Sequence, residues 1–458
     1  MPGGARLHDS SMKSYAKEAL SLLLLQAACA PSPRAVLDSP NLVIVSIDTL
    51  RADRLGLYGY FRETTPFLDS LGKESLVFER CLAPMAVTFP SHLSLFTGAY
   101  PEETGAFANA RVGGLAFVPT ARLRSLAQVL REGGYRTAAF VGATPLKRHT
   151  GIDAGFEHFD EPAAGQRRAG ATNKRVLSWL AARDDGPFFL WVHYFDPHKP
   201  YDAPEPFRSK FEEDPDQKLY LAGRGFEIST AEVNNRYDGE VSYADHELSQ
   251  LANELKSRPE IWRRTVLVVV GDHGEGLGQH GEPQHGSVWG EQLHVPLLIR
   301  APGVAPARIH RPMSVADVMP TLLGLIDVRG EDELLRQASG VDRLSTEDEN
   351  AFVLSQEASN YRTAEPRERW NALTGSEWKL IHEAGGRSRL FRVSEDPHEL
   401  EDVAEEYPDV VSSLEQHLLE SMERQRKRRA ELLAGRPAVD EDVDPEVLEQ
   451  LRALGYVP

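Results

Sequence analysis

Side chains that could bind a metal or do acid–base chemistry stand directly after three apolar, strand-like runs of the sequence. They are Asp48 after residues 41–47, Asp272 and His273 after residues 265–270, and His198 shortly after residues 188–192. An acidic residue at the end of one buried strand is common, so each cluster alone is weak evidence of function. Carboxylates and imidazoles that converge at one sheet edge repel each other or stay unsatisfied unless a cation lies among them. Together the three clusters predict a metal site.

A fourth segment, TFPSHLSLFTG at residues 88–98, adds a hydroxyl group. Pro90 suits the first turn of a helix and Gly98 suits its end, so Thr88 is expected at or just before a helix N-terminus. One interpretation is that Thr88 only caps this helix. The other is that the unpaired amide groups there stabilise a phosphate or sulfate group.

The elements that must position these residues are apolar, β-branched runs separated by helical patterns. The runs are residues 41–47, 135–141, 188–192, 265–270 and 295–299. An apolar stripe with spacings of three and four runs from Tyr237 to Leu255 and predicts a long helix. Strands that alternate with helices predict an α/β fold with a large, mostly parallel sheet sandwiched by helices. Ligands of such sheets bind beyond the carboxyl ends of the strands, where the polar clusters lie.

The sequence pattern changes near residue 340. Four short strand-like runs follow, at residues 351–355, 370–373, 378–381 and 390–393, and then a charged helical stretch at about 408–433. This pattern predicts a small C-terminal antiparallel sheet with a helix. We therefore expect a signal segment and linker at 1–34, a catalytic α/β domain at 35–340, and a C-terminal subdomain with a charged tail at 341–458.

Composition and the N-terminal segment bear on partners and location. The formal net charge of −18, from 51 Lys and Arg against 69 Asp and Glu, argues against a nucleic-acid-binding protein. The two cysteines, Cys29 and Cys81, exclude a disulfide scaffold and a thiolate zinc cluster. A basic stretch at 12–17, an apolar run and small residues before Cys29 are typical of an export signal. Their order resembles a bacterial lipoprotein signal, with Cys29 lipidated and the protein in the periplasm or on the outer membrane.

Several motifs in fixed order resemble those of sulfatase-like hydrolases of the alkaline phosphatase superfamily. They are SIDTLRAD at 46–53, PSH at 90–92 with TG at 97–98, DHGE at 272–275 with HG at 280–281, and VPL at 295–297. WKLI at 378–381, LF at 390–391 and DPHE at 396–399 are similar to the C-terminal subdomain of that family. The resemblance covers roughly residues 40 to 420 and implies an alkaline phosphatase-like fold.

The resemblance also implies roles for particular residues. The metal ligands it implies are Asp48, Thr88, Asp272 and His273; the catalytic residues are Thr88 as nucleophile with His198 and His285; and the substrate contacts are His92 and Lys199. His198 would contact the transferred group or protonate the leaving oxygen. His285 stands where the sulfatases proper usually have a lysine.

Departures from the family pattern concern the nucleophile and its surroundings. Sulfatases proper carry a Cys or Ser that is oxidised to formylglycine, and Thr88 cannot undergo that modification. His92 replaces the usual arginine, Thr49 replaces the second Asp of the usual pair, and the Gly-Lys-Trp-His element expected after residues 135–141 is absent. A threonine nucleophile is what the phosphoryl-transferring relatives use, so these departures favour phosphate over sulfate esters.

The leading hypothesis is a metal-dependent hydrolase that cleaves a small anionic phosphate or sulfate ester through Thr88. One alternative is a sulfuric ester hydrolase that works without formylglycine, and another is a non-catalytic cell-surface binding protein with the same fold. Mixed Asp and His ligands favour zinc or manganese, and calcium is a further option. One or two ions are compatible with the residues, since His198 and His285 could complete a second site.

Overall fold

The computed structural model describes residues 36–433 except 110–122, 184, 212–230, 347, 349–350, 359–368 and 384, together with residue 449. The predicted signal segment with Cys29 lies outside the described residues, as do residues 434–448 and 450–458 of the charged tail. The chain divides into a unit at 1–36 and a unit from Leu37 onward, and the description below concerns the second unit.

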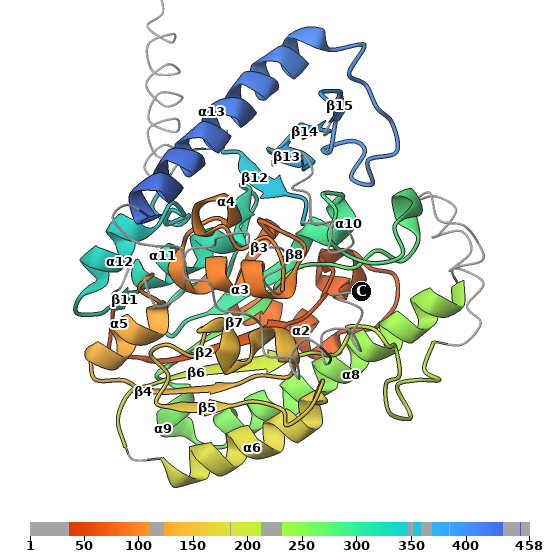
Figure 1. The fold of residues 1–458 in the computed structure, drawn as a ribbon. Coiled ribbons are helices and arrows are strands. Elements are labelled where there is room, and N and C mark those ends of the chain that lie inside the picture. The colour runs from red at the N-terminus through yellow and green to blue at the C-terminus, as the bar shows by residue number, and fades with distance from the viewer. Residues whose placement is uncertain are drawn as a thin grey trace, which may run out of the picture. The chain divides into compact units, whose positions relative to one another are not determined.

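A nine-stranded sheet forms the centre of this unit (Figure 1). Its middle strand β2 (Asn41–Ile47) pairs in parallel with β6 (Phe188–Tyr194) on one side and with β7 (Thr265–Gly271) on the other. The other strands are β3 (Leu76–Leu82), β4 (Arg136–Phe140), β5 (His158–Asp160), β8 (His294–Arg300), β9 (Ala307–Ile309) and β10 (Met313–Ser314). Only β8 runs antiparallel to its neighbours, β3 and β7, so the expected mostly parallel sheet is confirmed.

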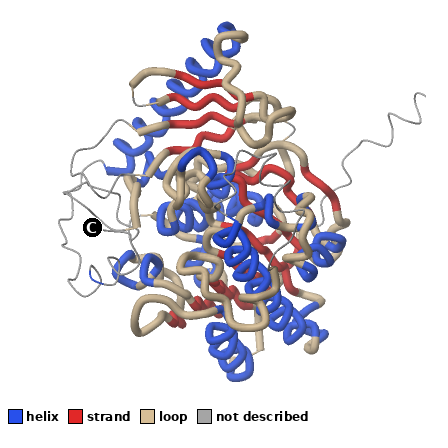
Figure 2. Tube along the Cα trace, turned by 90° about the vertical axis from the view of Figure 1, so that its right-hand side faces the viewer, coloured by secondary structure: helices blue, strands red, loops and turns tan. Residues whose placement is uncertain are grey.

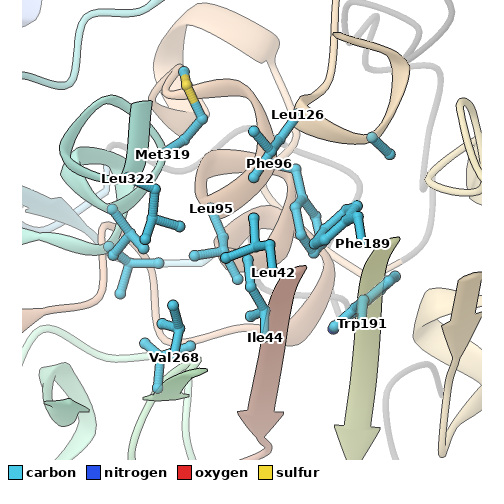
Figure 3. Packing of buried hydrophobic residues seen from close by; sticks show 14 of the residues in the cluster. Leu42, Ile44, Leu95, Phe96, Leu126, Phe189, Trp191, Val268, Met319 and Leu322 are labelled. Carbon is cyan, nitrogen blue, oxygen red and sulfur yellow. The ribbon is translucent and has the colours of Figure 1, made fainter. Parts of the chain in front are cut away.

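Helices cover both faces of the sheet because strand β2 is apolar on both sides. Leu42 and Ile44 pack into one cluster, with α3 (Thr88–Thr97), α5 (Leu126–Glu132) and α11 (Val318–Leu323). Val43 and Val45 pack into the other, with α2 (Pro66–Leu71), α6 (Ala169–Ala182) and α8 (Ala231–Lys256). Figure 3 shows the first cluster, where Leu95 and Phe96 of α3 lie against side chains of β2 and β6. This packing fixes helix α3, which begins with Thr88, over the centre of the sheet.

A separate four-stranded antiparallel sheet follows near the C-terminal end, as predicted (Figure 2). Its strands are β12 (Val353–Gln356), β13 (Asn371–Thr374), β14 (Lys379–His382) and β15 (Ser388–Phe391). Leucines on one face, among them Leu373 and Leu390, pack against helix α13 (Pro408–Leu433). The opposite face, with Ile381 and Phe391, packs against Val288 and Trp289 of the α/β core. The small sheet therefore touches the segment between β7 and β8.

The remaining elements are short. They are β1 (Leu37–Asp38), β11 (Ile326–Asp327), α4 (Pro101–Thr104), α9 (Pro259–Trp262), α10 (Gly290–Leu293), α12 (Glu331–Gln337), and the 3-10 turns η2 (Ala52–Arg54), η3 (Gly56–Tyr58), η4 (Gly72–Glu74), η6 (Thr144–Leu146), η7 (Arg148–Thr150), η9 (Gln279–Gly281) and η10 (Val315–Asp317). Within the described part of the chain, no helix has both the length and the apolar character needed to cross a membrane.

Candidate active site

Two acidic residues meet where the paired strands β2 and β7 end. Ile47 and Gly271 are register partners, so the residues that follow them, Asp48 and Asp272, emerge side by side. Asp272 is held by its Oδ1 atom, which accepts hydrogen bonds from the backbone N–H of Thr49 at 3.1 Å and of His273 at 2.7 Å. The backbone thus satisfies one oxygen of Asp272 and turns the other, Oδ2, toward Asp48 and His273.

The histidine that follows Asp272 faces both carboxylates. Its Nε2 atom lies 3.6 Å from Asp272 Oδ2 and 3.9 Å from Asp48 Oδ1. Asp48, Asp272 and His273 are all buried and offer ligand atoms within 4.8 Å of one another. The structure therefore brings together three of the four residues that the sequence proposes as metal ligands.

Thr88, the fourth of these residues, is the first residue of helix α3, with Val87 as the N-cap. The sequence placed Thr88 at or just before the helix start, and the interpretation of Thr88 as the N-cap residue is wrong. Its Oγ1 atom lies 3.5 Å from His273 Nε2. The first turn of the helix is fastened to the site, because the Ser91 hydroxyl donates to the Asp272 carbonyl at 2.6 Å.

Asn109 is a residue of the site that the sequence did not indicate. It is buried, and its Oδ1 atom accepts a hydrogen bond from the backbone N–H of Phe89 at 2.8 Å, next to Thr88. It therefore satisfies one of the amide groups at the start of α3 that have no partner within the helix. No local pattern could have revealed this contact, because the two residues are 20 positions apart and Asn109 lies in a loop.

The buried carboxylates fit a divalent cation. Both oxygens of Asp48 and Oδ2 of Asp272 are buried and have no hydrogen-bond partner among the described residues. Burial raises the pKa of Asp48 to about 8, although the nearby His285 opposes this shift. Burial, and then the charge of Asp48, raise the pKa of Asp272 well above its usual value. A cation between these two acidic side chains would offset the cost of burying their negative charges.

Three histidines surround this cluster with the same hydrogen-bond pattern. The Nδ1 atoms of His198, His273 and His285 lie 2.7, 2.8 and 3.2 Å from the Lys199 carbonyl, the Gly274 carbonyl and the Glu275 carboxylate respectively. Each of these partners only accepts, so each Nδ1 carries a proton and the neutral ring has its lone pair on Nε2. The His285 ring centre lies 4.6 Å from that of His273 and 5.2 Å from that of His198.

The pKa values separate two of these histidines. Burial, and then the neighbouring His285, lower the pKa of His198 to about 3. Burial is the largest single influence on the pKa of His285 and lowers it. The charge and hydrogen bond of Glu275, together with the charges of Asp48 and Asp272, raise that pKa, and the net pKa lies above the usual value. His285 is therefore the ring better stabilised as an imidazolium.

Of the two expected substrate contacts, His92 is buried and Lys199 is exposed. The Nδ1 atom of His92 donates to the Thr88 carbonyl at 2.8 Å, and its Nε2 atom lies 2.8 Å from the Ser46 hydroxyl, which accepts from Trp191 Nε1 at 2.9 Å. Both ring nitrogens of His92 are thus engaged by the protein. Lys199 is exposed, and its carbonyl is the partner of His198. Substrate contact by either residue stays a prediction.

The segment that carries His285 is anchored on two sides. On one side, Arg51 Nη1 donates to the Glu275 carbonyl at 3.0 Å and to Gln279 Oε1 at 2.7 Å. On the other, Lys379 of β14 donates to the Val288 carbonyl at 2.7 Å and pairs with Glu399 at 2.7 Å. Both Lys379 and Glu399 are buried. The C-terminal sheet therefore helps to position one wall of the site.

A cavity of about 1230 Å³ lies between the large sheet and the small one, lined by side chains such as Tyr58, Arg80, Glu291 and Trp378. None of the eight predicted site residues lines it. The cavity is thus separate from the cluster of Asp48 and Asp272.

The fold and the family comparisons identify the chain as a hydrolase that acts on esters. The chain belongs to the sulfatase family, whose model matches residues 40–328. It is 25% identical over 405 residues to an ulvan-active sulfatase of Formosa agariphila, covering 79% of this chain and 76% of that one. It is 26% identical over 442 residues to a choline-sulfatase of Rhizobium meliloti, covering 80% and 82%.

Solved structures share the fold. A phosphonate monoester hydrolase of Agrobacterium radiobacter superposes with a TM-score of 0.67 at 21% identity, over 84% of this chain and 96% of that one. A putative sulfatase of Bacteroides fragilis superposes with a TM-score of 0.73 at 18% identity, over 88% and 99%. The expected family and fold class are confirmed.

Proposed function

We propose that this protein hydrolyses small anionic esters, phosphate or phosphonate esters in preference to sulfate esters, with Thr88 as the nucleophile. The observation that carries the proposal is the position of the Thr88 hydroxyl. It stands at the start of a buried helix, 3.5 Å from His273 Nε2 and beside two buried carboxylates. Both oxygens of Asp48 and Oδ2 of Asp272 have no aligned hydrogen-bond partner among the described residues.

The start of helix α3 suits an anionic group. The first amide groups of a helix have no partner within it, and the helix dipole is positive at this end. In α3 the Phe89 N–H donates to Asn109, Pro90 has no N–H and the Ser91 N–H donates to the Val87 carbonyl. A tetrahedral anion at Thr88 would therefore meet the Thr88 N–H and the positive end of the helix dipole. The same arrangement stabilises negative charge that develops on the transferred oxygens during the reaction.

The residues that would hold a divalent cation are Asp48, Asp272, His273 and the Thr88 hydroxyl. When bound, such a cation supplies Lewis-acid chemistry: it lowers the pKa of the hydroxyl and offsets charge on the transferred group. Carboxylate and imidazole ligands together favour zinc or manganese, with calcium as a further option.

The reaction balances in two halves. In the first, Thr88 Oγ1 bonds to phosphorus as the bond from phosphorus to the leaving oxygen breaks. The proton of the hydroxyl passes to water, and the protonated His285 ring gives a proton to the leaving oxygen. In the second, water attacks phosphorus and Thr88 Oγ1 leaves with a proton. We assign proton delivery to His285, because its Nδ1–H faces a carboxylate, Glu275, whereas that of His198 faces only a carbonyl.

The preference for phosphorus follows from the unmodified threonine. Formylglycine cannot form from Thr88, and an ordinary alkoxide forms a phosphoester that water can hydrolyse. In support, the chain shares its fold with a phosphonate monoester hydrolase as well as with sulfatases. A sulfuric ester hydrolase without formylglycine and a non-catalytic binding protein are the alternatives.

The test is a panel of p-nitrophenyl phosphate, bis-p-nitrophenyl phosphate, p-nitrophenyl phenylphosphonate and p-nitrophenyl sulfate, each with zinc, manganese or calcium. We expect turnover of at least one phosphorus ester. We expect Thr88→Ala to lose about a thousandfold or more in kcat and Thr88→Ser to retain part of it. Intact-mass analysis of wild-type protein quenched during turnover should show one covalent adduct that is absent from Thr88→Ala.

Each other outcome selects an alternative. Turnover of the sulfate ester alone would support the sulfatase without formylglycine. Turnover of no ester with any of the three metals would support the binding protein. Wild-type rates in Thr88→Ala would remove the nucleophile assignment.

We also propose that residues 1–34 export the protein and that Cys29 carries a lipid. The support is the order of basic, apolar and small residues before Cys29. Labelling of producing cells with a radioactive fatty acid should mark the wild type and leave Cys29→Ser unmarked. Label that persists in Cys29→Ser would contradict the lipid assignment.

A further inference from the structure

His193 is a buried histidine at the same sheet edge that has no role in the scheme above. It is the sixth residue of β6, and it is fully buried. Its register partner on β2 is Ser46, two positions before Asp48. Because β2 and β6 run in parallel, this side chain reaches the carboxyl edge where the proposed cation ligands lie.

The hydrogen bond made by Nδ1 fixes the protonation of the His193 ring. The backbone N–H of Gly142, just beyond β4, donates to His193 Nδ1 at 3.2 Å. An atom that accepts a hydrogen bond carries no proton, so the ring is neutral and its single proton is on Nε2. The close approach needs a glycine at 142, because a Cβ there would lie 3.0 Å from the His193 carbonyl oxygen.

The Nε2–H group of His193 faces Asp48. Nε2 lies 3.3 Å from Asp48 Oδ2, and neither atom has an aligned hydrogen-bond partner among the described residues. A buried donor and a buried acceptor at this distance need only a small rotation of the ring or the carboxylate to pair. Leaving both unpaired is unfavourable, because each group has lost its contact with water and gained no hydrogen bond in return.

This tautomer distinguishes His193 from the histidine that is a proposed ligand. His273 donates from Nδ1 to the Gly274 carbonyl, so its lone pair is on Nε2, toward the carboxylates. His193 has the opposite arrangement, with its lone pair occupied by Gly142 and a proton on Nε2. It lies close enough to His92 and Asp272 to form a ligand group by distance alone, but its tautomer excludes ligation.

We propose that His193 is a positioning residue that donates from Nε2 to Asp48 Oδ2 and thereby orients Asp48 as a cation ligand. Oδ1, which lies on the side of His273, is then the oxygen presented to the cation. Removing a residue that hydrogen-bonds to a metal ligand in this way commonly lowers the metal affinity about 10- to 100-fold. The inference rests on the cation assignment of the proposed function, and its test does not depend on turnover.

The test measures Zn²⁺ binding to chelator-treated protein by isothermal titration calorimetry. His193→Leu removes the donor, whereas His193→Gln keeps an N–H donor near the position of Nε2–H. We expect His193→Leu to weaken Zn²⁺ binding about 10- to 100-fold and His193→Gln to stay within about threefold of the wild type. His294→Leu is the matched control, because His294 is a histidine of β8 whose Nε2 lies 2.8 Å from the Glu79 carbonyl and whose side chain lines the separate cavity; we expect this substitution to leave the affinity unchanged.

A second measurement determines which nitrogen of His193 carries the proton, and it does not require the His193→Leu variant to fold. Long-range ¹H–¹⁵N spectra of histidine-labelled, metal-free protein, with His193→Gln used to identify the resonance, should show His193 protonated on Nε2 alone. A proton on Nδ1 would overturn the proposal, even if His193→Leu did not fold.

The binding data can overturn it in three further ways. Loss of Zn²⁺ binding in His193→Gln, as severe as in Asp272→Ala, would make His193 a ligand. Unchanged affinity in His193→Leu would remove any positioning role. An equal loss in His294→Leu would show a nonspecific effect. Normal Zn²⁺ binding without ester turnover would instead refute the proposed function and leave the role of His193 standing.

Discussion

The chain of hydrogen bonds from Trp191 through Ser46 to His92 supports a prediction that two substitutions will not have additive effects. The indole N–H can only donate, so Ser46 Oγ accepts from it and its own proton goes to His92 Nε2. His92 Nδ1–H then donates to the Thr88 carbonyl. Every proton in this chain is placed by its neighbours.

The expected energies follow from which groups lose partners. Ser46→Ala leaves the indole N–H of Trp191 and Nε2 of His92 unpaired in a fully buried place, and each costs about 1–3 kcal/mol. Trp191→Phe leaves the bond from Ser46 to His92 intact and costs mainly packing. In the Trp191→Phe background only the His92 atom is left unpaired by Ser46→Ala. The cost of Ser46→Ala should therefore fall by about 1–3 kcal/mol in that background.

The assay is urea unfolding of the wild type, the two single variants and the double variant, followed by far-ultraviolet circular dichroism because two of the variants lack Trp191. Equal slopes across the four proteins allow the free energies of unfolding to be compared. If the loss in the free energy of unfolding caused by Ser46→Ala agreed within about 0.5 kcal/mol in the two backgrounds, the proposed series of hydrogen bonds from Trp191 through Ser46 to His92 would be refuted.

Three more predictions concern other parts of the molecule. Glu275→Gln removes the charged partner of His285 and should lower kcat about tenfold or more with a smaller change in KM; an unchanged kcat in steady-state assays would contradict the proton-donor assignment. Burial, and then the charge of a nearby aspartate, raise the pKa of Glu240 from its ordinary value of 4.5 to about 8. Because the pKa of Glu240 is higher in the folded state than in the unfolded state, its contribution to the free energy of unfolding is fully present below pH 4.5. That contribution falls by up to roughly 5 kcal/mol as the pH rises to 8. Urea unfolding at pH 5 and pH 8 should show a smaller loss of stability in Glu240→Gln than in the wild type. Lys379→Met leaves Glu399 buried without its partner and should cost about 3–5 kcal/mol in the free energy of unfolding, part of which a second substitution, Glu399→Leu, should recover; no recovery would point to lost packing instead.

Much of the fold could be predicted because the buried strands have strong local patterns. The run 41–47 is apolar at every position except Asn41 and Ser46, and it forms β2 with the same bounds. The stripe from Tyr237 to Leu255 lies within α8, Ala231–Lys256. β3 was not predicted, because Glu79 and Arg80 interrupt its apolar pattern. Its polar positions are tolerated because it lies near the sheet edge, where β9 and β10 are its only neighbours besides β8 among the described strands.

The candidate site was predictable where it depends on strand ends and not where it depends on tertiary contacts. Asp48, Asp272 and His273 follow strands whose register places them together, so the sequence pattern was sufficient. Asp238 of α8 is buried and paired with Arg62 at 2.6 Å, a contact between distant segments that the helix pattern could not reveal. The protonation of each histidine could not be foreseen either, because it depends on acceptors that only the folded chain brings near.

The central position of β2 determines when the site can form during synthesis. β2 is the first long strand of the described chain, but Asn41 and its partner on β7, Thr265, are 224 residues apart. At about 5–20 residues per second, a ribosome needs roughly 10–45 s to span that interval. For that time the uncharged segment NLVIVSI has no β7 to pair with and is open to pairing with other chains. Asp48 acquires Asp272 as a neighbour only afterwards, so the proposed cation, held by both residues, would stabilise the finished domain and would not guide its early folding.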